Sequence, residues 1–314
     1  MKVLVAGATG AIGKQLLPKL VTNGHEVVGI TRSEAKADAV RALDAEPAIA
    51  DALDPEAVAA AVAASEPEAI IHELTGLAGN LGSLHNLDRS FAATNRLRTE
   101  GTDHLLSAAR AAGVRRFLAQ SYAGWPYARS GGPVKDEEAP LDDDPPASAR
   151  QTIAAIRYLE QTVSEADGIE GIVLRYGGFY GPGTSIAPGG EQLEAIRKRQ
   201  FPVVGGGAGI TSFVHIEDAA EATVAALERA RPGIYNIVDD EPAEVREWLP
   251  EVASRIGAKP PWRVPRWVGR LLAGEAATTM MTEVRGASNE KAKRELGWAP
   301  GHPSWREGIP EAAR

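Results

Sequence analysis

Short apolar runs alternate in this chain with longer segments in which apolar residues recur at helical spacing. The apolar runs predict strands at Val3–Ala6, Glu26–Thr31, Glu46–Ala50, Ala69–Glu73, Arg116–Gln120 and Gly171–Arg175. The intervening segments predict one helix that begins near Ile12 and others at Ser33–Ala42, Pro55–Ala64, Asp88–Ala112 and Ala149–Ala166. Strands that alternate with helices form a parallel sheet with helices on both faces. We therefore expect an α/β fold built on a doubly wound parallel sheet.

Three glycines, Gly7, Gly10 and Gly13, separate the first predicted strand from the first predicted helix. In a strand–turn–helix unit, the first glycine permits the tight turn, the second lets the backbone approach phosphate, and the third lets the helix pack closely. The helix dipole and its free N–H groups then favour an anion at this end. This order of elements predicts a cradle for the pyrophosphate of a dinucleotide.

The composition changes after the sixth predicted strand. Five of the six tryptophans follow residue 240, and two of them, Trp262 and Trp267, lie within the proline-rich stretch 260–267. We expect residues 1–175, joined by 210–240, to form the dinucleotide-binding domain. Residues 176–314 are expected to form mainly a smaller substrate-binding lobe. The Pro- and Asp-rich stretch 131–146 is interpreted as a surface loop, because the sixth strand still follows it.

Composition narrows the possible partners. The 314 residues carry 34 basic and 42 acidic side chains and no cysteine, for a formal net charge of −8. This balance disfavours nucleic acid as a partner, and the lack of cysteine excludes disulfides and thiol catalysis. No apolar run reaches the ~18 residues of a membrane span, so we expect no membrane partner and a cytoplasmic location. The six histidines are scattered without metal-ligand spacing, so no metal site is expected.

Several motifs together resemble the extended short-chain dehydrogenases/reductases, also called the NAD-dependent epimerase/dehydratase family. The resemblance covers nearly the whole chain and is carried by Gly7–Gly13, Asp51, Ile71–Leu74, Asn95, Gly101–Thr102, Leu105–Val114, Leu174–Gly183, Ser212–Asp218 and Asn289–Trp298. It implies a Rossmann fold with a smaller C-terminal lobe. It also implies a nicotinamide cofactor and a small-molecule substrate, and homodimers are common in such a family. The reaction is less specified, because this fold carries many chemistries.

The end of the second predicted strand bears on the choice of cofactor. Members of this family that prefer NAD carry an acidic residue there, whereas this chain has Thr31 followed by Arg32. An arginine can bind a 2′-phosphate that an acid would repel. We expect NADP(H) to be preferred and NAD(H) to be possible, although a solvated arginine is the alternative interpretation. The resemblance and the glycine motif imply the cofactor-binding residues Gly7, Thr9, Gly10, Ala11, Ile12, Gly13, Arg32, Asp51, Ala52, Leu74, Asn95, Tyr176 and Gly177.

The expected catalytic centre departs from the family pattern. Active members carry Ser or Thr after the fifth strand and Tyr-x-x-x-Lys in the next helix. Here the Tyr and Lys places fall on Thr152 and Ile156, and the Ser/Thr place falls on Tyr122, beside Ser121. A phenol without a cationic neighbour keeps a pKa near ~10, so it can donate a proton but is a poor base. We expect Tyr122 to be the proton donor, with Ser121 as a second donor and Thr152 in reserve.

These features favour an NADP(H)-dependent oxidoreductase that reduces a carbonyl or a conjugated double bond by hydride transfer. Gly178 stands where sugar-nucleotide epimerases have an Asn, which weighs against an epimerase or dehydratase that recycles its cofactor. A non-catalytic NADP(H) sensor is a third interpretation. The residues expected to shape the substrate cavity are Trp125, Tyr127, Phe179, Tyr180 and Arg285.

Overall fold

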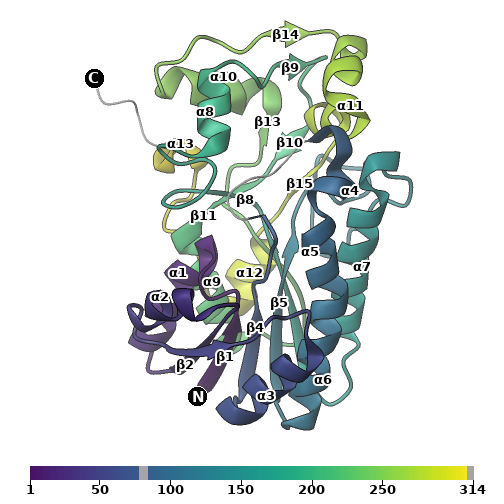
Figure 1. The fold of residues 1–314 in the computed structure, drawn as a ribbon. Helices are drawn as coiled ribbons and strands as arrows, with labels where there is room; N and C mark the ends of the chain where they lie inside the picture. The colour runs from purple at the N-terminus through teal and green to yellow at the C-terminus, as the bar shows by residue number, and fades with distance from the viewer. Residues whose placement is uncertain (78–83, 310–314) are drawn as a thin grey trace.

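A computed structural model describes residues 1–77 and 84–309 and has a seven-stranded, fully parallel sheet at its centre (Figure 1). The strand order is β12-β7-β5-β4-β1-β2-β3, so the order reverses between β1 and β4. The strands are β1 (Lys2–Ala6), β2 (Glu26–Thr31), β3 (Glu46–Ile49), β4 (Ala69–His72), β5 (Arg116–Tyr122), β7 (Glu170–Tyr176) and β12 (Gly233–Ile237). The predicted doubly wound α/β fold is confirmed. Ligands of such sheets bind beyond the carboxyl ends of the strands, where the order reverses.

Helices cover both faces of the sheet and form two separate apolar cores. The first core is filled by α1 (Ala11–Thr22), α9 (Ile216–Arg229) and α12 (Glu290–Leu296). The second is filled by α3 (Pro55–Ser65), α6 (Thr102–Ala111) and α7 (Arg150–Ser164). The strands β1, β4 and β7 are nearly fully buried, as expected for parallel strands covered on both sides.

The helix predicted at Asp88–Ala112 is not continuous. It consists of α4 (Leu87–Ser90), α5 (Ala92–Arg96), the π-helical turn η3 (Leu97–Gly101) and α6. Single π-helical turns inside α-helices are frequently found at functional sites. The predicted helix Ser33–Ala42 is likewise split into the 3₁₀ turn η1 (Glu34–Lys36) and α2 (Ala37–Arg41).

The second lobe lies beyond one end of the sheet (Figure 1). It holds α8 (Glu191–Arg197), α10 (Val245–Arg255), α11 (Arg266–Thr282), α13 (Trp305–Gly308) and the short strands β8 (Gly178–Tyr180), β9 (Val203–Val204), β10 (Ile210–Thr211), β11 (Phe213–His215), β13 (Ala243–Glu244) and β14 (Arg263–Val264). Much of it packs around a third core that includes Phe213, Leu249 and Trp305. The predicted surface loop 131–146 contains β6 (Val134–Lys135), which pairs with β15 (Gly286–Ala287), and η4 (Ala147–Ala149) precedes α7.

The 3₁₀ turn η2 (Leu84–Asn86) precedes α4. Within the described ranges 1–77 and 84–309, no helix is long and apolar enough to cross a membrane.

Candidate cofactor and active site

A single cavity of about 930 Å³ runs along the carboxyl ends of the central strands and reaches into the second lobe. The glycine turn after β1 and the ends of β2, β4, β5 and β7 form one wall. The opposite wall comes from the second lobe and includes Phe179, Phe213 and Trp248. The cavity therefore lies where a doubly wound sheet binds its ligand.

The glycine turn has room for backbone only. Gly7 has φ +104°, and a Cβ there would lie 2.6 Å from the carbonyl oxygen of Glu73. A Cβ on Gly13 would lie 2.4 Å from the carbonyl oxygen of Gly7. Gly10 caps α1 without any side-chain hydrogen bond, which leaves the first-turn N–H groups of the helix to an anion. The turn thus fits the pyrophosphate of a dinucleotide.

Basic side chains lie at the far end of the cavity from the second lobe. Arg32, which follows β2, and Lys36, at the end of η1, both line it. Asp51 and Ala52 line the same region, and an Asp51 carboxylate oxygen accepts a hydrogen bond from the backbone N–H of Leu53 at 3.0 Å. Lys36 was not among the residues expected from sequence, because only its place in η1 turns it toward this end.

Most of the expected cofactor residues line the cavity, with two exceptions. Gly13 lies behind the turn, where its lack of a side chain lets α1 pack closely. Asn95 does not reach the cavity, because its amide nitrogen donates to the hydroxyl of Thr152 at 3.1 Å. The expectation that Asn95 contacts the cofactor is therefore corrected.

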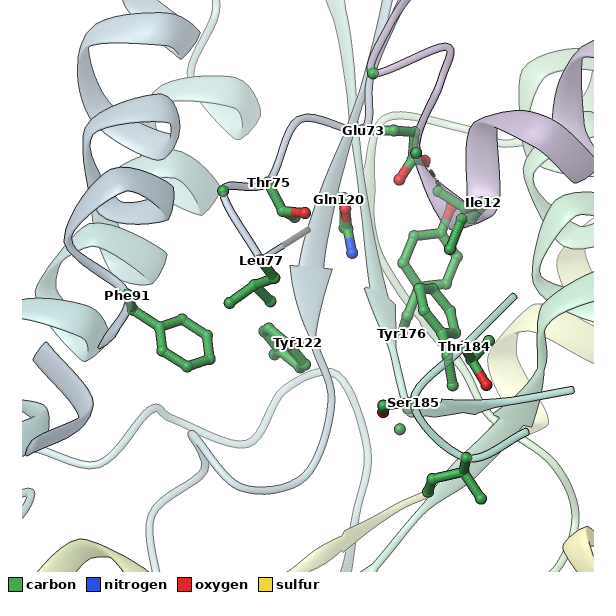
Figure 2. A pocket seen from close by; sticks show the side chains of 18 of the residues that line it. Ile12, Glu73, Thr75, Leu77, Phe91, Gln120, Tyr122, Tyr176, Thr184 and Ser185 are labelled. Atoms are coloured by element: carbon green, nitrogen blue, oxygen red, sulfur yellow. Dashed lines mark hydrogen bonds between the residues drawn. The ribbon is translucent and has the colours of Figure 1, made fainter. Parts of the chain in front are cut away.

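Tyr122, the last residue of β5, faces the cavity (Figure 2). Its ring makes an edge contact with Trp125 at 5.8 Å between centroids, and the Arg98 guanidinium lies 5.3 Å from its centroid. Burial raises the pKa of the Tyr122 phenol, and the charge of Arg98 lowers it. The sequence expectation of a phenol with no cationic neighbour was wrong, because Arg98 comes from the distant turn η3.

Two of the three expected catalytic residues lie outside the cavity. Ser121 points to the other face of β5, where its hydroxyl donates to a Glu160 carboxylate oxygen at 2.6 Å. The same carboxylate forms a buried ion pair with Arg175 at 2.6 Å. Thr152 is fully buried, and its hydroxyl donates to Asp88 at 2.8 Å. Neither hydroxyl is available to a substrate, so these expectations are corrected.

The expected substrate residues divide in the same way. Trp125 and Phe179 line the cavity, but Tyr127, Tyr180 and Arg285 do not. Both tyrosines are fully buried: the Tyr127 hydroxyl donates to the side-chain oxygen of Asn236, and that of Tyr180 donates to a backbone carbonyl. Arg285 donates to the backbone carbonyl of Arg129 at 2.9 Å. These three residues support the structure of the loops instead of the cavity.

Two cavity residues, Glu73 and Gln120, were not recognised as site residues from sequence (Figure 2). Glu73 follows β4 and accepts a hydrogen bond from the Tyr176 hydroxyl at 2.9 Å, which in turn lies 2.6 Å from the Thr223 hydroxyl. Its second carboxylate oxygen is buried and has no hydrogen-bond partner in the described residues. Burial raises the pKa of Glu73 to about 8, so the carboxyl is mostly protonated at neutral pH. Sequence reasoning could have found Glu73 and Gln120, because both lie at the carboxyl ends of predicted strands, where such sheets bind ligands.

One group of potential metal ligands lies elsewhere, at the start of α9. Ligand atoms of His215, Glu217 and His302 lie within 4.8 Å of one another. The two imidazole rings stack at 3.8 Å between centroids, with 27° between their planes. Because ring lone pairs lie in the ring planes, stacked rings do not direct them at a common point. His215 and His302 are 87 positions apart in the sequence, so no short spacing motif could have predicted this group.

The model of the NAD dependent epimerase/dehydratase family matches residues 3–238. The chain belongs to this family. The expected resemblance is thereby confirmed.

Similar proteins include reductases and epimerases. The chain is 46% identical to a 3-diazoavenalumate denitrifying reductase from a Streptomyces species, over 98% of this chain and 99% of that protein. It is 29% identical to a 4-hydroxy-2-methyl-3-oxo-4-farnesyl-3,4-dihydroquinoline-1-oxide ketoreductase from Stigmatella aurantiaca, over 98% and 95% of the two chains. A UDP-glucose 4-epimerase from Thermus thermophilus, solved with NAD, superimposes with a TM-score of 0.73 at 25% identity, over 99% and 97%.

This epimerase/dehydratase family member is an NAD(P)-dependent oxidoreductase that acts on a small molecule.

Proposed function

We propose that the protein is an NADP(H)-dependent reductase that transfers a hydride to a carbonyl or a conjugated double bond. The observation that carries this proposal is the continuity of one cavity past the glycine turn, Tyr122 and the apolar residues of the second lobe. When bound, NADPH supplies the hydride. The protein positions the acceptor between Tyr122 and residues such as Phe179, and it excludes water with its second lobe.

The preference for NADPH rests on Arg32 and Lys36, which give the cavity two cations where a 2′-phosphate would lie. Arg32→Ser removes a charge-assisted hydrogen bond, so we expect the Kd for NADPH to rise roughly 10- to 100-fold and the Kd for NADH to change little. Arg41→Ser is the matched control, since Arg41 lies on α2 outside the cavity and pairs with Asp38. Equal losses for both nucleotides in Arg32→Ser would refute the preference.

Proton delivery rests on Tyr122. The raised pKa of its phenol keeps it protonated at neutral pH, so it can donate to an oxygen that gains negative charge. Ile156 lies in an apolar cluster with Ala123 and Tyr127, and therefore supplies no cation to a catalytic tyrosine. This arrangement suits reduction better than the reversible proton transfer of an epimerase.

Reductive loss of dinitrogen from an aromatic diazo compound is a second candidate. It is favoured by the relative at 46% identity, which is named a denitrifying reductase. Addition of hydride to the terminal nitrogen of an aryldiazonium ion gives an aryldiazene. Loss of N₂ from the diazene, with its hydrogen transferred to carbon, leaves the arene. The reaction takes up no proton from the protein, so it does not require the missing Tyr–Lys pair.

A screen of NADPH oxidation over aldehydes, ketones, enones and aryldiazonium compounds separates these reactions. Comparison of the wild type with Tyr122→Phe adds the mechanistic test: carbonyl reduction is expected to fall roughly 100-fold, whereas diazonium reduction is expected to keep its rate. Net NADPH consumption argues against a recycling epimerase. Tight NADPH binding without consumption across the whole panel would favour a cofactor sensor.

A further inference from the structure

Arg98 is a buried cation that forms no direct ion pair within residues 1–77 and 84–309. It lies in the π-helical turn η3 and is 2% exposed. Neither of its terminal guanidinium nitrogens has a hydrogen-bond partner within residues 1–77 and 84–309. Burial of an unpaired charge is strongly unfavourable, so such a residue contributes little to stability and calls for another explanation.

The groups around Arg98 come from three elements. Tyr122 on β5 lies under the guanidinium, 5.3 Å from its centre to the ring centroid. His72 on β4 and Glu160 on α7 also interact electrostatically with Arg98. The Glu160 carboxylate is already bound by Arg175 and Ser121, and burial lowers the pKa of His72 to about 4, so this imidazole is neutral at neutral pH. Among these three groups, Tyr122 is the one that lines the cavity.

We propose that Arg98 is a positioning residue that takes over the electrostatic role of the missing lysine. Its guanidinium stabilises the negative charge that develops on the Tyr122 oxygen when this phenol gives its proton to the reduced substrate. An arginine keeps its charge in such a place, whereas a lysine readily loses it when buried. The cation reaches Tyr122 from the π-helical turn η3 and not from α7, where Ile156 occupies the family's lysine place.

This inference deepens the proposed function, but its first test is independent of substrate and cofactor. 3-Fluorotyrosine placed at position 122 allows the phenol to be titrated by ¹⁹F NMR in the free protein. The guanidinium lies 5.3 Å from the ring centroid, and Coulomb's law with an effective dielectric constant of about 20 predicts that Arg98→Met raises the titration midpoint by about 2 pH units. Arg98→Lys should raise the midpoint by a similar amount, because a buried lysine loses its charge at the alkaline pH of this titration. An unchanged midpoint in Arg98→Met would overturn the proposal.

The second test separates function from stability. Because the buried guanidinium is unpaired, Arg98→Met should leave the urea midpoint unchanged or raise it. With a carbonyl substrate from the screen, the same variant should lower kcat about tenfold or more and leave the Kd for NADPH unchanged. A lower urea midpoint together with an unchanged kcat would identify Arg98 as merely structural. If Arg98→Met does not fold, Arg98→Gln, which also removes the charge, replaces it in the ¹⁹F titration, and an unchanged midpoint in that variant contradicts the proposal.

Absence of NADPH binding in the wild type would refute the proposed function and leave the titration result standing. A ¹⁹F titration midpoint that stays unchanged when Arg98 is replaced would refute this inference and leave the reductase proposal standing.

Discussion

Replacement of Glu73 by Gln should change how the stability of the protein depends on pH. The Glu73 carboxyl is buried, and burial raises its pKa from the ordinary 4.5 to about 8. Between these two values the folded protein holds a proton that the unfolded chain releases. The free energy of unfolding therefore falls as pH rises through this window.

The magnitude follows from the groups that titrate in the same range. Burial raises the pKa of Asp239 to about 8 and lowers that of His72 to about 4. The imidazole stabilises the fold progressively as pH rises from about 4 to 6.5, which opposes the two carboxyls. Between pH 6.5 and 8, Glu73 and Asp239 each contribute a slope of about −1.4 kcal/mol per pH unit. Glu73→Gln should therefore reduce the loss over this interval by about 2 kcal/mol.

Urea denaturation of the cofactor-free protein at four pH values between 6.5 and 8 measures this slope. Asp239→Asn is the matched control, because it removes the second carboxyl whose pKa burial raises to about 8 and should produce a similar change. The double variant should lose most of the pH dependence in this range. If the wild type and Glu73→Gln lose stability with the same slope, the assignment of Glu73 as a neutral carboxyl at pH 7 is refuted.

Three further changes test the glycine turn and the donor. Gly13→Ala should lower the unfolding free energy by about 1 to 3 kcal/mol, since its Cβ would lie 2.4 Å from a backbone oxygen; denaturation midpoints measure this. Gly10→Ala should instead weaken NADPH binding with a smaller effect on stability, because its nearest contact is 3.2 Å; calorimetric titration measures this, and unchanged affinity would contradict the phosphate role. Tyr122→Phe should lower kcat for carbonyl reduction roughly 100-fold with NADPH affinity retained; unchanged turnover would exclude Tyr122 as the donor.

The sequence predicted the strands well because buried parallel strands are continuous apolar runs. All six expected strands are present, with ends within two residues of those expected. The seventh, β12 (Gly233–Ile237), was not named as a strand, although residues 210–240 were expected to join the dinucleotide-binding domain. The glycine turn was equally predictable, since the local backbone leaves no room for a Cβ at Gly7 or Gly13.

The catalytic environment was much harder to predict, because it depends on which face of a strand each side chain occupies. Ser121 and Tyr122 are neighbours in sequence, and alternation along β5 sends them to opposite sides. Arg98 belongs to no recognised motif, and its place depends on a π-helical turn. Glu73 lies within the motif Ile71–Leu74, but its role depends on burial beside Tyr176. The roles of Arg98 and Glu73 depend on contacts between elements that are distant in sequence, so they become visible only in the folded structure.

The most direct test of the central claim is a crystal structure of the protein with NADPH. The proposal predicts the pyrophosphate at the glycine turn, the 2′-phosphate beside Arg32, and the nicotinamide ring next to Tyr122. A nicotinamide ring bound away from Tyr122 would contradict it. So would a cavity that holds no cofactor in crystals grown with saturating NADPH.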